Sequence, residues 1–192
     1  MPIRVDAYMS EGVASGVLAH GGHLRDVLEQ DRILPLHGVQ WQPLDGLPGP
    51  AADVAIPSDD VLIAVADDDP TIPVHAQWHG IRLELGPYTV EGEMPTLPGF
   101  DPGRALTRPS GEFVLLRDVS LGLRSEVSPP TPPTPIGHHA LINRYFVDSV
   151  ECDLMLGFFF PGAAILQQEV AETGALIGPS TASASATGTD PA

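Results

Sequence analysis

Histidine is the residue type whose spacing in this sequence comes closest to that of a metal site. The sequence contains seven histidines, and two pairs, His20 with His23 and His75 with His79, have intervals that metal ligands use on helices. The first pair lies in a glycine turn, and the second lies at the start of an expected strand, where residues four apart are separated by about 13 Å. The sequence therefore predicts exposed or capping histidines and no metal cofactor.

Nucleophiles and acidic clusters give no stronger indication of catalysis. The aspartates at 59–60 and 67–69 lack the ligand order of a calcium loop, and they are expected to be acidic strand ends. Cys152 lies between Glu151 and Asp153, and these carboxylates oppose formation of the reactive thiolate. The sequence lacks the G-x-S-x-G, Walker A and G-x-G-x-x-G motifs. We expect no catalytic residues, although a metal-dependent hydrolase built from scattered histidines and aspartates remains an alternative.

One short region resembles a known family. Arg104-x-x-x-Arg108 and Asp118-x-Ser120-x-Gly122 resemble the R-x-x-x-R and D-x-S-x-x-G motifs of PilZ domains, which are small β-barrels that bind cyclic di-GMP. In this chain Gly122 comes one place early, and only nine residues separate the two motifs. The resemblance implies a second alternative, a cyclic di-GMP sensor that binds through Arg104, Arg108, Asp118, Ser120 and Gly122.

Large aromatic residues are candidates for a partner surface. Phe158, Phe159 and Phe160 are consecutive, and the two tryptophans are Trp41 and Trp78. Aromatic side chains dominate both protein cores and protein interfaces. Core packing is the simpler interpretation, and a docking surface at Phe158, Phe159 and Phe160 is the functional one.

The charge of the chain limits its partners. Nine basic residues, all of them arginine, face 25 acidic residues, which gives a formal charge of −16. This charge opposes binding to nucleic acid or anionic lipid and favours a basic partner. The most apolar run, residues 154–166, is interrupted by Pro161 and is shorter than the roughly 20 residues that span a bilayer. With one cysteine and no recognisable signal segment, we expect a cytoplasmic location.

An internal repeat is the clearest organisation in the sequence. Residues 32–41 align with residues 112–121 without a gap, and Gly16 matches Gly92 in a preceding strand-like segment. In the same alignment residues 4–7 match residues 82–85, and a helical turn near residues 24–28 faces residues 103–106. Each copy then has a proline-rich loop, at 43–57 or 129–135, followed by an expected strand at 61–65 or 145–150. The shared order favours duplication.

The predicted fold is therefore mainly β, with two tandem, diverged small β-barrel or sandwich repeats and a short C-terminal helix or arm. We expect the first repeat at 1–70, the second at 71–155, an apolar arm or short helix at 156–177 and a disordered tail at 178–192. The leading functional hypothesis is a non-enzymatic protein-binding or assembly module. It would hold a protein partner, or a second copy of itself, through the groove between the repeats, the phenylalanine segment or an open strand edge.

Overall fold

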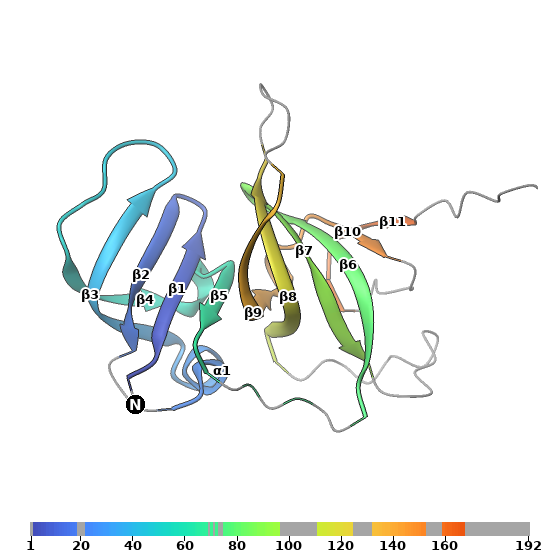
Figure 1. The fold of residues 1–192 in the computed structure, drawn as a ribbon, viewed down its shortest axis with the longest axis horizontal. Coiled ribbons are helices and arrows are strands. Elements are labelled where there is room, and N and C mark those ends of the chain that lie inside the picture. The colour runs from blue at the N-terminus through green and yellow to red at the C-terminus, as the bar shows by residue number, and fades with distance from the viewer. Residues whose placement is uncertain are drawn as a thin grey trace, which may run out of the picture.

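The computed structural model describes residues 2–18, 22–68, 70, 72, 75–96, 111–124, 132–152 and 159–167. These residues form eleven strands and a few short helical turns (Figure 1). The strands are β1 (Arg4–Met9), β2 (Gly12–Leu18), β3 (Ile33–Pro43), β4 (Ala52–Pro57), β5 (Ile63–Ala66), β6 (Gln77–Leu85), β7 (Tyr88–Thr96), β8 (Phe113–Leu123), β9 (Thr134–Asn143), β10 (Ser149–Cys152) and β11 (Ala164–Gln167). The helical turns are α1 (Leu24–Asp26), η1 (Val27–Asp31), η2 (Ser58–Asp60) and η3 (Arg144–Phe146). None of the described helices has the length and apolar character needed to cross a membrane.

All eleven strands belong to one mixed sheet, in the order β11-β10-β6-β7-β8-β9-β5-β1-β2-β3-β4. Strands β1–β5 form one group and β6–β10 another, and we call these groups the first half and the second half (Figure 1). The two halves join where β5 pairs with β9, with Ile63 opposite Ile142 and Val65 opposite Ala140. The prediction of barrels is corrected here, because the sheet stays open and β4 and β11 are its outer strands.

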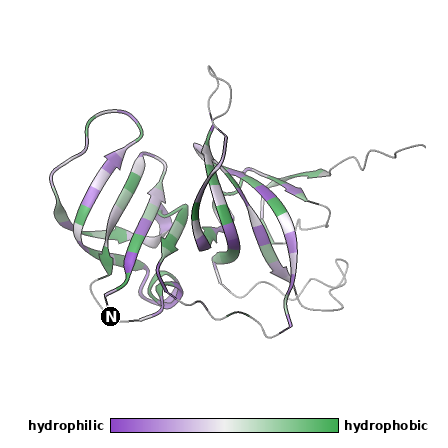
Figure 2. Ribbon diagram, in the orientation of Figure 1, coloured by the Kyte–Doolittle hydropathy of each residue, from purple (hydrophilic) through white to green (hydrophobic). Residues whose placement is uncertain are grey.

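Alternation of apolar and polar residues explains why these segments pair as strands with one buried face. In β2 the buried and partly exposed residues alternate, and Figure 2 shows apolar and polar residues interleaved along the strands. The buried residues form two clusters, one mainly from each half. Each cluster also takes side chains from the other half. The second-half cluster includes Leu62, Ile63 and Val65, and the first-half cluster includes Phe113, Leu115 and Leu141. The two cores are therefore interdependent.

Strand order is the same in both halves, and the register of β2 with β3 matches that of β7 with β8. The first half has the order β5-β1-β2-β3-β4, and the second half has β10-β6-β7-β8-β9. In the first half Val17 pairs with His37, and Ser15 pairs with Gln40. The equivalent pairs of the second half are Glu93 with Arg117 and Glu91 with Ser120. Equivalent backbone bonds recur as well, from Ser58 N–H to Arg32 O and from Arg144 N–H to Glu112 O, both 3.0 Å long.

A bulge lies at the same place in each half, opposite a glycine. Gly16 and Gly92 lie where the registers of β2 with β3 and of β7 with β8 shift by one residue. A Cβ atom on Gly92 would lie 3.0 Å from the Arg117 carbonyl oxygen, and one on Gly16 would lie 3.1 Å from the His37 carbonyl oxygen. The residue after each carbonyl, Gly38 or Asp118, has a positive φ. The close approach of two backbones explains the glycine at both positions.

Several sequence predictions of local structure need correction. Both proline-rich loops contain strands, since β4 occupies the end of one and β9 begins in the other. The expected strand at 145–150 begins as the helical turn η3 and becomes β10 only at Ser149. Residues 164–167, within the segment 156–177 expected to be an apolar arm or short helix, form β11, which pairs parallel to β10. Residues 168–177 and the tail at 178–192 lie outside the described residues.

Candidate functional site

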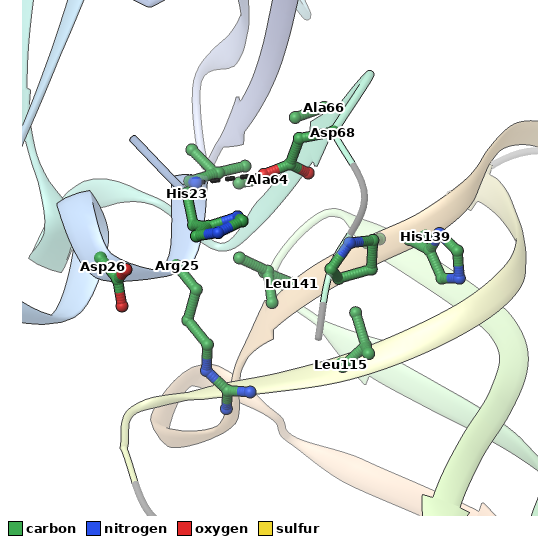
Figure 3. A pocket seen from close by; sticks show the side chains of 12 residues that line it. His23, Arg25, Asp26, Ala64, Ala66, Asp68, Leu115, His139 and Leu141 are labelled. Carbon is green, nitrogen blue, oxygen red and sulfur yellow. Dashed lines mark hydrogen bonds between the residues drawn. The ribbon is translucent and has the colours of Figure 1, made fainter. Parts of the chain in front are cut away.

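An apolar cavity of about 90 Å³ lies between the two halves (Figure 3). Its lining comes from the turn containing α1, from β5 with the residues after it, and from β8 and β9. Ala64, Ala66 and Ala140 leave the space open, and Leu115 and Leu141 extend the apolar surface. A cavity of this size and lining can hold a small apolar group or one apolar side chain.

Polar groups at the rim of this cavity are largely occupied by structural hydrogen bonds. Asp68 accepts a hydrogen bond of 3.2 Å from the backbone N–H of Leu24, at the start of α1. The Arg25 guanidinium donates to the carbonyl oxygen of Phe113 at 2.5 Å and to Glu29 Oε1 at 3.2 Å. The bond from Arg25 to Phe113, together with a bond of 3.4 Å from the Phe113 N–H to Glu29 Oε1, links α1 and η1 of the first half to β8 of the second half. Arg25 at the rim therefore stabilises the junction of the two halves.

A second, larger depression of about 440 Å³ lies elsewhere on the junction, and we call it the junction groove. Equivalent turns of the two halves converge on it: the tip of the β1–β2 hairpin and η2 from one half, and Gly86, Phe146 and Asp148 from the other. Its apolar and acidic lining residues are Met9, Glu11, Trp41, Asp59, Asp60, Leu62, Phe146 and Asp148. Sequence reasoning proposed a groove between the repeats but named none of these residues for it, because they come from turns far apart in the chain.

Two arginines already bind carboxylates of the junction groove. Arg32 pairs with Glu112 and, at 2.5 Å, with Asp59. The hydrogen bond from Arg32 to Glu112, together with the charges of Glu112 and Asp59, raises the pKa of that guanidinium above its usual value. At the other side, Arg124 pairs with Asp148 at 3.0 Å and with Glu84 at 3.4 Å. The groove thus presents carboxylates in positions that guanidinium groups can reach.

The open edge of the sheet at β4 carries an exposed apolar surface. Ile33 is 49% exposed on one face of the sheet, and Val54 is 40% exposed on the other. Asp53 is held on this edge by the Gly38 N–H, at 2.9 Å, and by His37 at 3.0 Å. The Gly38 hydrogen bond, followed by that of His37, lowers the pKa of Asp53 below its usual value. Among the described strands β4 pairs only with β3, so one row of its backbone groups remains available.

The residues of the PilZ-like motif are only partly within the described structure. Arg104 and Arg108 lie outside the described residues. Asp118 lies at the bulge of β8 with φ of 50°, and its side chain is near Arg117 and His138, at 3.8 and 3.7 Å. Ser120 pairs with Glu91, and Gly122 pairs with Thr89, in the ladder between β7 and β8. Asp118 thus occupies the bulge position that Gly38 occupies in the first half.

The aromatic candidates are mostly packed within the protein. Phe160 is completely buried in the second-half cluster, and Phe159 packs against the same cluster, whereas Phe158 lies outside the described residues. The Phe160 ring is therefore inaccessible to a partner in this structure. Trp41 packs partly against the first-half cluster, and Trp78 lies under the guanidinium of Arg117, 4.0 Å from the ring centroid.

The remaining candidate residues for chemistry are dispersed. His23 precedes α1, His79 lies within β6, and Cys152 is buried at the end of β10. Within the described parts of the chain, no group of three or more histidine, cysteine or acidic residues is arranged to hold a metal ion. Comparison of the chain with models of protein families, with curated proteins and with solved structures finds no match.

Proposed function

We propose that the chain is a non-enzymatic protein-binding module made from two diverged copies of one small β-domain, which holds its partner along the open edge at β4. The duplication is supported by strand order, register, bulges and helical turns that recur in both halves. Pairing relates Val5 to Ile81, because Val5 lies opposite Gly16 and Ile81 lies opposite Gly92. By this pairing β1 aligns with β6 two residues away from the sequence match, which placed residues 4–7 over residues 82–85.

The binding proposal depends on a difference between two equivalent surfaces, one in each half. In the second half Phe113, Leu115 and Leu141 lie on the outer face of β8 and β9, and they are buried against the first half with exposures of 1%, 6% and 6%. The equivalent residues by strand register are Ile33, Pro35 and Ala55, where Pro35 pairs with Ala55 as Leu115 pairs with Leu141. We call Ile33, Pro35 and Ala55 the outer face of β3–β4. In the first half Ile33 and Ala55 on this face are exposed and Pro35 is half-buried, and no other described strand packs over them.

An apolar face beside an unpaired strand edge is suited to strand addition. The backbone of β4 can supply hydrogen bonds to an extended segment, and the outer face of β3–β4 can supply apolar contacts. The second half uses the same combination internally, because β9 pairs with β5 while Leu141 enters the neighbouring core. The partner is therefore a protein that presents an extended strand flanked by apolar side chains, and a second copy of this chain is included among such partners.

The test compares partner capture by the wild-type chain and by the Ile33→Lys, Ala55→Lys double variant. Both positions are exposed, so the variant is expected to fold, and it should lose the partner or the self-association that the wild type shows. A matched control with Leu123→Lys and Leu166→Lys, which are 42% and 50% exposed elsewhere, should retain it. Hydrogen exchange at residues 54–56 should slow in the complex. Equal loss in both variants, or unchanged exchange along β4, would contradict the proposal.

A further inference from the structure

We infer that the junction groove binds a cationic side chain, an arginine or a lysine, of a basic protein segment. This site is separate from the β4 edge and does not depend on it. The groove has apolar walls formed by Trp41, Leu62 and Phe146, and Phe146 is 41% exposed. Carboxylates lie around these walls, so that a cation with an apolar stem can pack its stem on the rings and direct its charged end to an acid.

The chain's own arginines show how guanidinium groups are held at this place. Arg32 pairs with Asp59, and Arg124 pairs with Asp148, so two of the four groove carboxylates are neutralised from within. Glu11 and Asp60 are exposed and form no salt bridge with any described residue. These two acids are the ones available to an incoming cation.

Stacking of a guanidinium on an indole ring also has a precedent in this chain. Arg117 lies over the ring of Trp78 at 4.0 Å while its nitrogens bind Glu93, at 2.5 and 2.7 Å. A cation held between an aromatic ring and a carboxylate is therefore an arrangement that the fold already contains. Trp41, Glu11 and Asp60 line the same groove, so the groove contains the same two kinds of chemical group.

The overall charge favours the same class of partner. The chain has a formal charge of −16 and no lysine, so its field attracts cations and repels a second copy of itself at the groove. A hollow lined by one sign of charge concentrates that attraction. The occupant is thus a basic segment of another protein, and a second copy of this acidic chain is disfavoured.

The experiment titrates a blocked peptide of alternating glycine and arginine into the full chain at low ionic strength. Trp41 is made the only tryptophan by Trp78→Phe, so that its fluorescence reports the groove. We expect saturable binding with a change in Trp41 emission, and no binding of the matching glycine and glutamate peptide. The Glu11→Gln, Asp60→Asn variant should bind about tenfold or more weakly.

The control removes the same charge elsewhere. Asp31→Asn with Asp45→Asn, both exposed and outside the groove, should change the affinity by less than about twofold. Phe146→Ala should weaken binding, whereas Leu47→Ala, at an exposed apolar side chain outside the groove, should not. If the two double carboxylate variants weaken binding equally, the peptide is attracted by net charge alone and the inference is overturned. Absence of a change in Trp41 fluorescence would also overturn it. The Ile33→Lys, Ala55→Lys variant should bind the peptide normally, which separates this test from that of the β4 edge.

Discussion

Replacing Tyr88 with phenylalanine tests whether the two halves unfold as one unit. Tyr88 begins β7 in the second half and is 1% exposed. Its hydroxyl group donates to the carbonyl oxygen of Met9, 3.0 Å away, and lies 3.4 Å from that of Gly12. Its ring meets the edge of Tyr8 at a centroid distance of 5.7 Å. The hydroxyl therefore links the second half to the β1–β2 hairpin of the first.

The expected loss of stability follows from this hydrogen bond. The substitution removes one buried donor and keeps the ring, so the packing against Tyr8 is retained. A buried carbonyl group left without its donor destabilises the native state by about 1–3 kcal/mol. We therefore expect the free energy of unfolding to fall by about 1–2 kcal/mol near neutral pH. Ser10→Ala, which removes an exposed hydroxyl group from the tip of the same β1–β2 hairpin, serves as the control and should change it by less than about 0.5 kcal/mol.

The same side chain makes stability depend on alkaline pH. Burial, and to a smaller extent Tyr8, raises the pKa of Tyr88 to about 12, from 10.0 for an unperturbed tyrosine. Between these values the native state holds a proton that the unfolded state has lost, so stability is complete below pH 10 and declines as pH rises toward 12. Two pKa units correspond to a loss of at most about 3 kcal/mol. The Tyr88→Phe variant lacks this contribution, so its stability should approach that of the wild type above pH 10.

The assay is urea unfolding followed by tryptophan fluorescence, because each half contains one tryptophan. Trp41 lies in β3 and Trp78 in β6, so Trp78→Phe and Trp41→Phe variants report the two halves separately. Tyr88→Phe should shift both transitions to the same lower urea concentration. A shift confined to one half, or an equal difference between variant and wild type at pH 8 and pH 11, would refute the reasoning.

Three other substitutions or titrations have clear expected outcomes. Gly92→Ala should destabilise the fold by about 1–3 kcal/mol in urea unfolding, because the new Cβ atom would press on the Arg117 carbonyl oxygen. The control Gly80→Ala should be nearly neutral, because a Cβ atom there would have no atom within 4 Å. Leu141→Ala should lower stability by about 2–4 kcal/mol in the same assay, because its side chain is buried in the core of the opposite half. Calorimetric titration with cyclic di-GMP should give no heat, and heat that Arg104→Ala abolishes would instead support the PilZ-like alternative.

Sequence reasoning succeeded where apolar alternation is strong and local. Most of segments 32–41 and 112–121 lies in β3 and β8, which are strands with buried apolar residues such as Leu34 and Leu116. Strand β4 was missed because five of its six residues are exposed, so it has almost no buried face to produce a pattern. Strand β9 was missed because Pro135 and Gly137 interrupt its exposed beginning. Strand β11 exists through its pairing with β10, which is a tertiary contact that periodicity cannot reveal.

The candidate sites were less predictable than the strands. The junction groove brings together Glu11, Asp60 and Phe146, each from a different turn, and no short motif contains them. The outer face of β3–β4 could be identified only from the structure. There the equivalent residues of the second half, Phe113, Leu115 and Leu141, are buried in the core of the first half. In contrast, the proposal of a basic partner could be made from composition alone, because it depends on the net charge of −16 and not on the position of any residue.

The exchange of side chains between the two cores limits how this chain can be divided. A fragment that ends after β5 would expose the cluster that Phe113 and Leu115 normally cover, and a fragment that begins at β6 would leave those same residues in water. Either piece expressed alone should aggregate, whereas the two pieces expressed together should reassemble. The connection between β5 and β6 would then act as a tether, and a protease cut within it would leave the halves associated. The chain is in this respect suited to use as a split-protein reporter.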